Sequence, residues 1–274
     1  MIHLLSDEGR HVLRAVAVRP VLYAFDFDGT LAPISAERDA VRVSRTMSEW
    51  LQELSKRSCC AVVSGRALAD LAPRINGAVP HLIGNHGIEG PLSTQETLLR
   101  AEEVCTDWKR QMVAEAAALL AALGAEVEDK RYSLTVHVRG ARDAEAACRQ
   151  TLPLLRRLTP APQLIMGKYS INVLPPGQGG KGPATLALMV HLRRSGLFFI
   201  GDDETDESVF AMTEGLTLGV RVGKQAGSHA KYFLNHPGEV EEVIRFLVHR
   251  MDRTPEDVDP DGRMSTGARS SKNS

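Results

Sequence analysis

The sequence predicts an α/β fold, with a Rossmann-like core built on a parallel sheet and an α+β cap domain inserted into it. Short apolar runs that end in polar or glycine-rich residues alternate with helical patterns, which is typical of parallel strands buried on both faces. The middle of the chain breaks this alternation with a long helical pattern and two segments of strict period-two alternation. We therefore expect a core of residues 1–89 and 175–250, a cap of residues 90–174, and a disordered tail of residues 251–274.

The expected core elements follow one another along the chain. Residues 4–18 predict an amphipathic helix rather than a targeting segment, because no charged and then apolar stretch leads to a small-residue cleavage site. Strands are then expected at 21–25, 59–64, 81–87, 197–202 and 216–223, and helices at 43–57, 67–75, 181–196 and 207–214. In an open parallel sheet, ligands bind beyond the carboxyl ends of the strands.

The expected cap has one long amphipathic helix at 93–123, closed by Gly124, and two half-buried strands at 132–139 and 167–173. Each strand alternates an apolar face with a polar one. The apolar faces carry Leu134, Val136 and Val138, and Tyr169, Ile171 and Val173; the polar faces carry Ser133, Thr135, His137 and Arg139, and Lys168, Ser170 and Asn172. The polar faces suit a lid that pairs with hydroxyls or phosphate, although an ordinary solvated sheet face has the same pattern.

Composition excludes two classes of partner. A formal net charge of -1 supplies no broad basic field for nucleic acid, and no apolar run reaches the roughly 18 residues of a membrane span. The four cysteines, at positions 59, 60, 105 and 148, lack CxxC spacing, which predicts reduced thiols and a cytoplasmic protein. No feature of the sequence indicates an oligomeric state.

Two aspartates follow the first expected core strand. Asp26 and Asp28 in D-F-D-G-T lie just beyond its carboxyl end, and a period of two directs both side chains the same way. Two like charges so close are costly unless a cation neutralises them, so the pair predicts an oxygen-ligated Mg2+. A solvated acidic turn before a helix is the alternative interpretation.

A second acidic cluster follows the strand expected at 197–202. It contains Asp202, Asp203, Asp206 and Glu207. Asp202 lies nearest to the strand and is the expected metal ligand from this loop, where a cation could bridge both acidic clusters. Asp206 and Glu207 also suit the N-terminus of a helix, because acidic side chains there favour the helix dipole.

A metal and a spare carboxylate suit phosphoryl transfer, and two further residues fit that chemistry. Ser64 ends the strand at 59–64 and begins a Gly-Arg turn, where its hydroxyl and the following amides can hold phosphate oxygens. Lys181 in G-G-K-G opens another helix and can neutralise the transferring group. A helix cap and a solvated loop are the ordinary roles of such residues, but their order between the two acidic loops favours catalysis.

These four motifs, which contain Asp26, Ser64, Lys181 and Asp202, resemble those of the haloacid-dehalogenase superfamily of phosphohydrolases. The resemblance implies that Asp26 is the nucleophile that forms an aspartyl-phosphate, and that Asp28 protonates the leaving oxygen and then activates water. It implies that Asp26, the backbone carbonyl of Asp28 and Asp202 hold Mg2+. Asp203 and Asp206 have supporting positions in the last motif, and the insertion resembles the type-two α+β cap of this HAD-like fold.

Longer segments resemble the trehalose-6-phosphate phosphatases. They are DFDGTLAPI, VVSGR, GNHGIEG, VEDKRYSLTVHVR, GKYSINVLPPGQGGKG and FIGDDETDESVF. The resemblance implies that the partner is a small-molecule sugar phosphate and that the reaction releases trehalose and phosphate from trehalose 6-phosphate. The candidates for substrate binding are Arg66, His86, Glu89, Lys130, His137, Arg139, Lys168 and Asn172. His86 taken alone suits a structural hydrogen bond, and Asn172 stands where family members often carry a glutamate.

Three alternatives stay open at the level of sequence. A phosphatase of another sugar phosphate, such as sucrose 6-phosphate or a hexose phosphate, would carry the same core motifs. A sugar phosphomutase would use the same Asp26 chemistry, but superfamily mutases commonly place a helical cap between the first two motifs. Here residues 29–63 provide room for one helix and its connections. A non-catalytic sugar-phosphate sensor would be expected to lack a nucleophile or a metal ligand, and none is missing.

Overall fold

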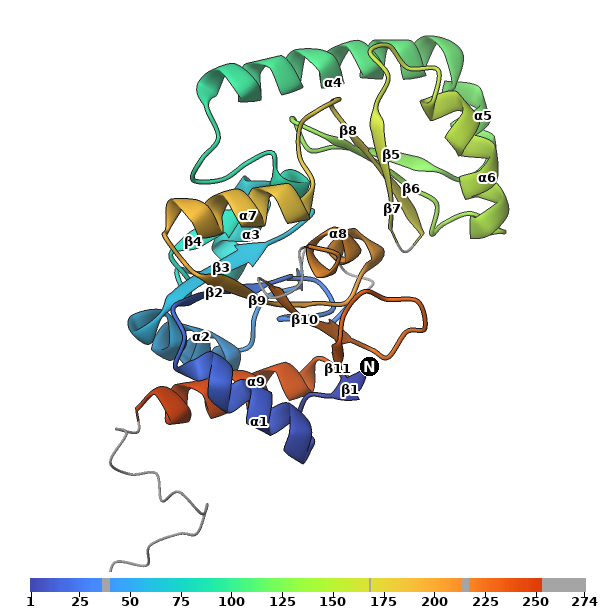
Figure 1. The fold of residues 1–274 in the computed structure, drawn as a ribbon. Coiled ribbons are helices and arrows are strands. Elements are labelled where there is room, and N and C mark those ends of the chain that lie inside the picture. The colour runs from blue at the N-terminus through green and yellow to red at the C-terminus, as the bar shows by residue number, and fades with distance from the viewer. Residues whose placement is uncertain (36–39, 168, 213–216, 253–274) are drawn as a thin grey trace, which may run out of the picture.

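The computed structural model describes residues 1–35, 40–167, 169–212 and 217–252, and it contains two β-sheets with helices packed on them (Figure 1). The larger sheet has seven parallel strands in the order β1-β11-β10-β9-β2-β3-β4. These strands are β1 (Ile2–His3), β2 (Val21–Phe25), β3 (Cys59–Val63), β4 (His81–Ile83), β9 (Gly196–Gly201), β10 (Thr217–Val222) and β11 (Tyr232–Leu234).

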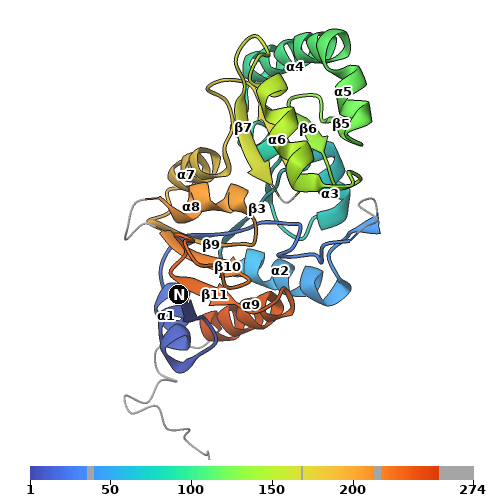
Figure 2. The ribbon, with the colours of Figure 1, turned by 90° about the vertical axis from the view of Figure 1, so that its right-hand side faces the viewer.

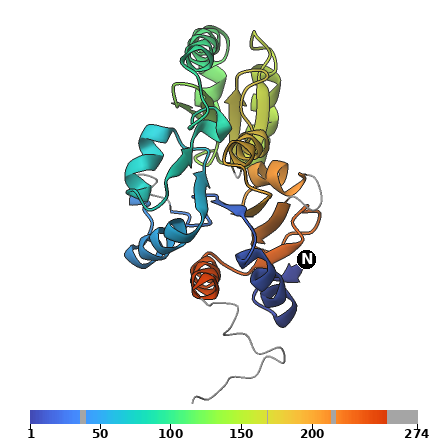
Figure 3. The ribbon, with the colours of Figure 1, turned by 60° about the vertical axis from the view of Figure 1, so that its left-hand side comes forward.

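Helices cover both faces of this sheet, because successive residues of its strands point into two different apolar cores. In β2, Tyr23 and Phe25 face one core while Leu22 and Ala24 face the other, and all four are fully buried. The first core is completed by α1 (Asp7–Ala17), α2 (Arg45–Arg57), α3 (Leu68–Ile75) and α9 (Gly238–Met251), and the second by α7 (Lys181–His191) and α8 (Glu207–Phe210). In Figure 3 the red α9 and the dark blue α1 lie side by side at the bottom of the molecule.

The second sheet has four antiparallel strands in the order β5-β6-β8-β7. Its strands are β5 (Glu126–Asp129), β6 (Leu134–His137), β7 (Gln163–Gly167) and β8 (Ser170–Leu174), and its helices are α4 (Gln95–Glu115), α5 (Ala117–Ala122) and α6 (Ala144–Leu155). Leu134, Val136, Ile171 and Val173 pack against these helices in a core that contains the buried Trp108. Figure 2 shows this second layer above the seven-stranded sheet.

The predicted fold class is confirmed, since a parallel-sheet core carries a separate antiparallel sheet with its own helices. The cap boundaries at 89/90 and 174/175 stay predictions. The predicted tail from position 253 onward, residues 213 and 214 of the helix predicted at 207–214 and the first residue of the strand predicted at 216–223 lie outside the described residues. Met251, which was predicted to belong to the tail, is the last residue of α9, and α8 already ends at Phe210. Within the part of the chain that the structure covers, no helix is both long and apolar enough to cross a membrane.

Four predicted elements differ from the structure. The strand predicted at 167–173 contains a turn, because Gly167 ends β7, Tyr169 takes a left-handed φ of 61° and β8 begins at Ser170. The strand predicted at 81–87 ends at Ile83, because Asn85 and His86 take left-handed φ values of 49° and 54° in the 3-10 turn η2 (Asn85–Gly87). The helix predicted at 93–123 breaks at Ala116, whose φ is −127°, and α5 then buries Leu120 in the core of the second sheet. The helix predicted at 181–196 ends at His191, and Gly196 already belongs to β9.

Candidate active site

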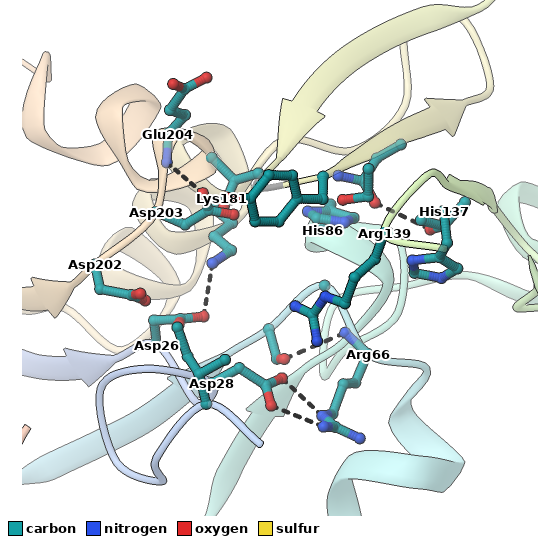
Figure 4. A pocket seen from close by; sticks show the side chains of 18 of the residues that line it. Asp26, Asp28, Arg66, His86, His137, Arg139, Lys181, Asp202, Asp203 and Glu204 are labelled. Carbon is teal, nitrogen blue, oxygen red and sulfur yellow. Dashed lines mark hydrogen bonds and ion pairs between the residues drawn. The ribbon is translucent and has the colours of Figure 1, made fainter. Parts of the chain in front are cut away.

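A cavity of about 890 Å³ lies between the two sheets. Its core wall comes from the loops that follow β2, β3 and β9 at the carboxyl edge of the parallel sheet, and it carries Asp26, Ser64 and Asp202. Its cap wall comes from β6 and β8 and carries Thr135 and Asn172. Figure 4 shows Asp26 and Lys181 of the core wall and Arg139 of the cap wall around the same space, whereas the Glu204 side chain points away from it.

Asp26 forms a buried ion-pair triad with Lys181 and Asp206. The Lys181 Nζ, at the first residue of α7, donates to Asp26 Oδ1 at 2.6 Å and to Asp206 Oδ1 at 2.7 Å. Burial raises the pKa of the Asp26 carboxyl well above its usual value, Lys181 opposes that rise, and Asp206 and Asp202 add to it. Although burial alone would lower the pKa of Lys181, the two carboxylates raise it. The ionised form of Asp26 therefore depends on the cations beside it.

Asp202 completes a cluster of carboxylates that fits a divalent cation. One carboxylate oxygen each from Asp26, Asp202 and Asp206 lie within 4.8 Å of one another. The Asp202 Oδ1 is buried and has no hydrogen-bond partner among the described residues. Burial, followed by the charges of Asp206 and Asp203, raises the pKa of Asp202 to about 7. Oxygen ligands of this kind are those that hard divalent cations prefer, and a bound cation would satisfy the unpartnered oxygen.

Asp28 binds Arg66 through both of its carboxylate oxygens. The Arg66 Nε donates to Oδ2 and the Nη2 donates to Oδ1, each at 2.7 Å, and the guanidinium lies 5.4 Å from the centre of the Phe27 ring (Figure 4). The sequence argument that a cation must neutralise the two aspartates is met in part by Lys181 and Arg66, which pair with them. The sequence predicts that Arg66 binds substrate; its side chain lines the cavity and pairs with Asp28, and its contact with a substrate stays a prediction.

Ser64 and His86 lie in the core wall of the cavity, next to Gly65. The Ser64 Oγ accepts from the Arg66 amide at 3.2 Å, and the Ser64 carbonyl accepts from the His86 amide at 3.0 Å. Both His86 ring nitrogens are buried without a partner at hydrogen-bond distance among the described residues. Burial, followed by the charges of Lys130 and Lys181, holds the pKa of His86 well below its usual value.

The side-chain amide of Asn172 lies in the cap wall, where two hydrogen bonds hold it. The Asn172 Oδ1 accepts from Thr135 Oγ1 at 3.0 Å, and the Asn172 Nδ2 donates to the Ile165 carbonyl at 3.3 Å. Asn172 is 4% exposed and lines the cavity. These two hydrogen bonds orient the side chain that stands where a glutamate was expected.

His137 and Arg139 belong to the same wall. The His137 Nε2 lies 2.6 Å from Glu128 Oε2, and Arg139 is exposed and extends toward the core aspartates in Figure 4. Lys168 lies outside the described residues. Contacts of these side chains with a substrate stay predictions.

The turn after β5 attaches the cap to the core. The Lys130 Nζ donates to the Gly65 carbonyl at 2.9 Å, and the Lys130 carbonyl accepts from Asn85 Nδ2 at 3.1 Å. The Ser133 Oγ donates to Asn85 Oδ1 at 2.5 Å. Glu89 accepts from Asn85 Nδ2 at 2.6 Å and from the first amide of α3 at 2.8 Å. Lys130 thus lies in the cavity wall, while Glu89 supports Asn85 and is not among the described lining residues.

Asp203 and Asp206 order the loop after β9, and Arg221 lies beside it. Asp203 caps the short η3 helix (Glu204–Asp206), and its amide donates to Asp206 Oδ2 at 3.0 Å. The Arg221 Nη1 donates to the Asp203 carbonyl at 3.1 Å and to Glu207 Oε1 at 2.8 Å. The sequence prediction missed Arg221, which lines the cavity. One basic residue within an otherwise apolar strand was the available signal.

The described residues between Asp28 and Ser64 form α2, β3 and their connections. A second, helical cap of the kind expected in a sugar phosphomutase is absent from this described part. The position of the four-stranded sheet, after β4 and before α7, therefore favours the phosphatase interpretation of the sequence over the mutase interpretation.

The protein family and the curated proteins that match this chain are described as trehalose phosphatases. The model of the family described as trehalose-phosphatase matches residues 24–237. The chain is 28% identical over 262 residues to trehalose 6-phosphate phosphatase RA3 of Zea mays, covering 87% of this chain and 73% of that protein. It is 32% identical over 256 residues to the trehalose-phosphate phosphatase of Mycobacterium tuberculosis, covering 88% of this chain and 64% of that protein.

Solved structures share the fold. The C-terminal domain of Candida albicans trehalose-6-phosphate phosphatase matches with a TM-score of 0.71 at 22% identity, covering 88% of this chain and 97% of that one. A crystal form of Aspergillus fumigatus trehalose-6-phosphate phosphatase matches with a TM-score of 0.58 at 22% identity, covering 91% and 99% of the two chains. At these identities the likeness concerns the arrangement of core and cap.

Proposed function

Because the chain belongs to the trehalose-phosphatase family of the haloacid-dehalogenase superfamily, it is a trehalose-6-phosphate phosphatase, and we propose that it hydrolyses this ester through a phosphate carried on Asp26. The observation that supports this mechanism is the placement of Asp26 beside Lys181 and Asp202, with Asp28 in the same wall. A nucleophilic carboxylate and a second carboxylate for proton transfer thus share one cavity.

Asp26 attacks phosphorus in the first step, and the bond to the sugar oxygen breaks. Lys181 favours the ionised form of Asp26 and balances the charge of the phosphoryl group, since a preorganised cation in a buried site stabilises developing charge strongly. Asp28 gives its proton to the departing oxygen of trehalose. In the second step Asp28 takes a proton from water, the oxygen of that water attacks the aspartyl-phosphate, and inorganic phosphate leaves with Asp26 restored.

Mg2+ is the proposed cofactor, with Asp26, Asp202 and the backbone carbonyl of Asp28 as its protein ligands. When bound, it would offset the negative charge that the carboxylates and the phosphate bring together. Asp206 lies within the same oxygen cluster but already accepts from Lys181 and from the Asp203 amide. We assign Asp206 the role of holding Lys181 and the loop in place.

The cap wall is proposed to bind the sugar and to determine substrate specificity. Thr135, His137, Arg139 and Asn172 face the cavity from β6, β8 and the residues beside them. Their amide, imidazole, hydroxyl and guanidinium groups can pair with the hydroxyls of the second glucose ring. A cytoplasmic location is proposed from the cysteines, all four of which are unpaired.

Phosphate release from trehalose 6-phosphate tests the proposal. The enzyme is assayed after treatment with EDTA, and again after Mg2+ is added back. We expect activity to disappear with the metal and to return with it. Full activity in metal-free buffer would overturn the metal assignment, and no phosphate release in the presence of Mg2+ would overturn the function.

A further inference from the structure

A chain of alternating charges leads from Asp28 away from the cavity. The third guanidinium nitrogen of Arg66, Nη1, donates to Asp70 Oδ2 at 2.8 Å. The Asp70 Oδ1 accepts from Arg74 Nε at 3.0 Å and also from Arg74 Nη2. The Arg74 Nη1 donates to the Val41 carbonyl at 2.8 Å. Two edges of the Arg66 guanidinium are therefore held, one by Asp28 and one by Asp70 (Figure 4 shows the Asp28 contact).

The spacing of these residues produces the chain. Arg66, Asp70 and Arg74 are four residues apart, so they follow one side of α3 and the turn that leads into it. Arg66 is 7% and Arg74 is 5% exposed, whereas the Asp70 side chain is 41% exposed. Partial burial would raise the pKa of Asp70, but the hydrogen bonds from Arg74 and Arg66 and their charges together lower it below its usual value. An ionised carboxylate thus stands between two buried guanidinium groups.

We propose that Asp70 is a positioning residue for the reaction: it holds the Arg66 guanidinium in the one orientation that fixes the Asp28 carboxylate in the cavity wall. A bidentate arginine fixes a carboxylate in direction as well as distance, and an arginine whose remaining nitrogens are held has little freedom of its own. Without Asp70, the Arg66 and Arg74 charges repel each other, and Arg66 can rotate with Asp28. The inference rests on the proposed role of Asp28.

A purely structural role for Asp70 is the competing explanation, because an acidic residue in the first turn of a helix also stabilises that helix. Glu53 of α2 provides a matched control. It accepts from Lys56 at 2.6 Å and from Arg57 at 2.7 Å, and its side chain is 36% exposed. Asp70→Asn and Glu53→Gln therefore remove one carboxylate between two cations at similar exposure. Glu53 does not belong to the described wall of the cavity.

The experiment is a rapid-mixing assay of the Mg2+-loaded enzyme with p-nitrophenyl phosphate, together with steady-state kinetics on trehalose 6-phosphate. The p-nitrophenolate ion leaves without a proton, so phosphorylation of Asp26 by this ester makes little use of Asp28. Hydrolysis of the aspartyl-phosphate still needs Asp28 to activate water. In Asp70→Asn we expect the first turnover of p-nitrophenyl phosphate to keep its rate within about twofold, and the steady-state rate to fall about tenfold. With trehalose 6-phosphate, kcat should fall about tenfold while KM changes less than about twofold.

Glu53→Gln should have the wild-type rate both in the first turnover and in the steady state. Equal losses in both phases for Asp70→Asn, or no loss at all, would overturn the positioning role while leaving the phosphatase assignment intact. An inactive wild-type enzyme would instead overturn the proposed function. If Asp70→Asn does not fold, Arg74→Lys tests the proposal in its place. This variant keeps a positive charge at position 74 but cannot donate two hydrogen bonds to Asp70 from one planar group. It should then show a smaller loss confined to the steady-state phase, and an unchanged steady state would contradict the proposal.

Discussion

Lys181 and Asp26 are 155 residues apart in the chain, and the Lys181 Nζ donates to Asp26 Oδ1 at 2.6 Å. The contact forms because β2 ends at the same edge of the parallel sheet at which α7 begins. The same ammonium group holds Asp206, so one cation joins the loop after β2 to the loop after β9. Removing Asp26 and removing Lys181 should therefore affect activity and stability differently.

Replacing the nucleophile should abolish turnover without unfolding the protein. In Asp26→Asn the amide cannot attack phosphorus, while Lys181 keeps its ion pair with Asp206. We expect kcat on trehalose 6-phosphate to fall by about 10⁴-fold or more, with a far-UV circular dichroism spectrum like that of the wild type. Asp107→Asn, which removes an exposed carboxylate of α4, is the control and should stay fully active. A folded Asp26→Asn enzyme with most of its activity would end the covalent mechanism.

Removing Lys181 should cost more than removing the Ser64 hydroxyl. Lys181→Ala leaves Asp26 and Asp206 buried without their shared cation, so we expect kcat to fall about 10²- to 10³-fold. The free energy of unfolding should fall as well, by about 3–5 kcal/mol. Ser64→Ala removes one neutral hydroxyl and should lower kcat about tenfold. Both variants are assayed under conditions in which circular dichroism shows them to be folded. Small and equal losses of kcat would indicate that both residues have structural roles only.

Gly29 should be required for metal binding. Its φ is +83°, and a Cβ at this position would stand 2.2 Å from Asp202 Oδ2. We expect Gly29→Ala to displace the Asp202 carboxylate and to raise the Mg2+ concentration for half-maximal activity about ten- to hundredfold. Gly227→Ala is the control, because its φ is +84° and, apart from its chain neighbours, no heavy atom of the described residues lies within 4 Å of the added Cβ. Equal Mg2+ requirements in the two variants would show that the space beside Asp202 is not needed.

The cap should affect substrates only when they are large enough to touch it. Arg139→Ala and Asn172→Ala should each lower kcat/KM for trehalose 6-phosphate tenfold or more, because binding energy from the second sugar ring is lost. Turnover of p-nitrophenyl phosphate should change less than about twofold. Arg149→Ala, an exposed arginine of α6, is the control and should leave both substrates unaffected. Equal losses on both substrates would place the two residues in the chemistry rather than in recognition.

The core of the site could be predicted from the sequence because its residues are tied to the ends of buried strands. Asp26, Ser64 and Asp202 each follow an apolar run, and parallel strands bring such ends to one edge. The pairing of Asp28 with Arg66 could not be predicted, since local spacing does not specify which arginine reaches a given carboxylate. The same holds for Asn85, which binds Ser133 from 48 residues away.

The strands that the sequence analysis missed lack the patterns on which it relied. β1 and β11 have two and three residues, too few to show a period. β5 reads Glu-Val-Glu-Asp and is mostly exposed at the edge of the second sheet, so it has no apolar face to detect. β7 lies at the other edge. These strands are stabilised by pairing with a neighbour, which depends on tertiary structure rather than on local sequence.

The identity of the sugar is the central claim, and kcat/KM with Mg2+ on three esters tests it most directly. Asn172, oriented by Thr135 and the Ile165 carbonyl, can both donate to and accept from a hydroxyl, so we expect it to preserve recognition of the disaccharide. The account predicts that kcat/KM for trehalose 6-phosphate exceeds the values for sucrose 6-phosphate and glucose 6-phosphate by at least about tenfold, or about 1.4 kcal/mol in transition-state binding. A tenfold preference for either of the other two esters would contradict it.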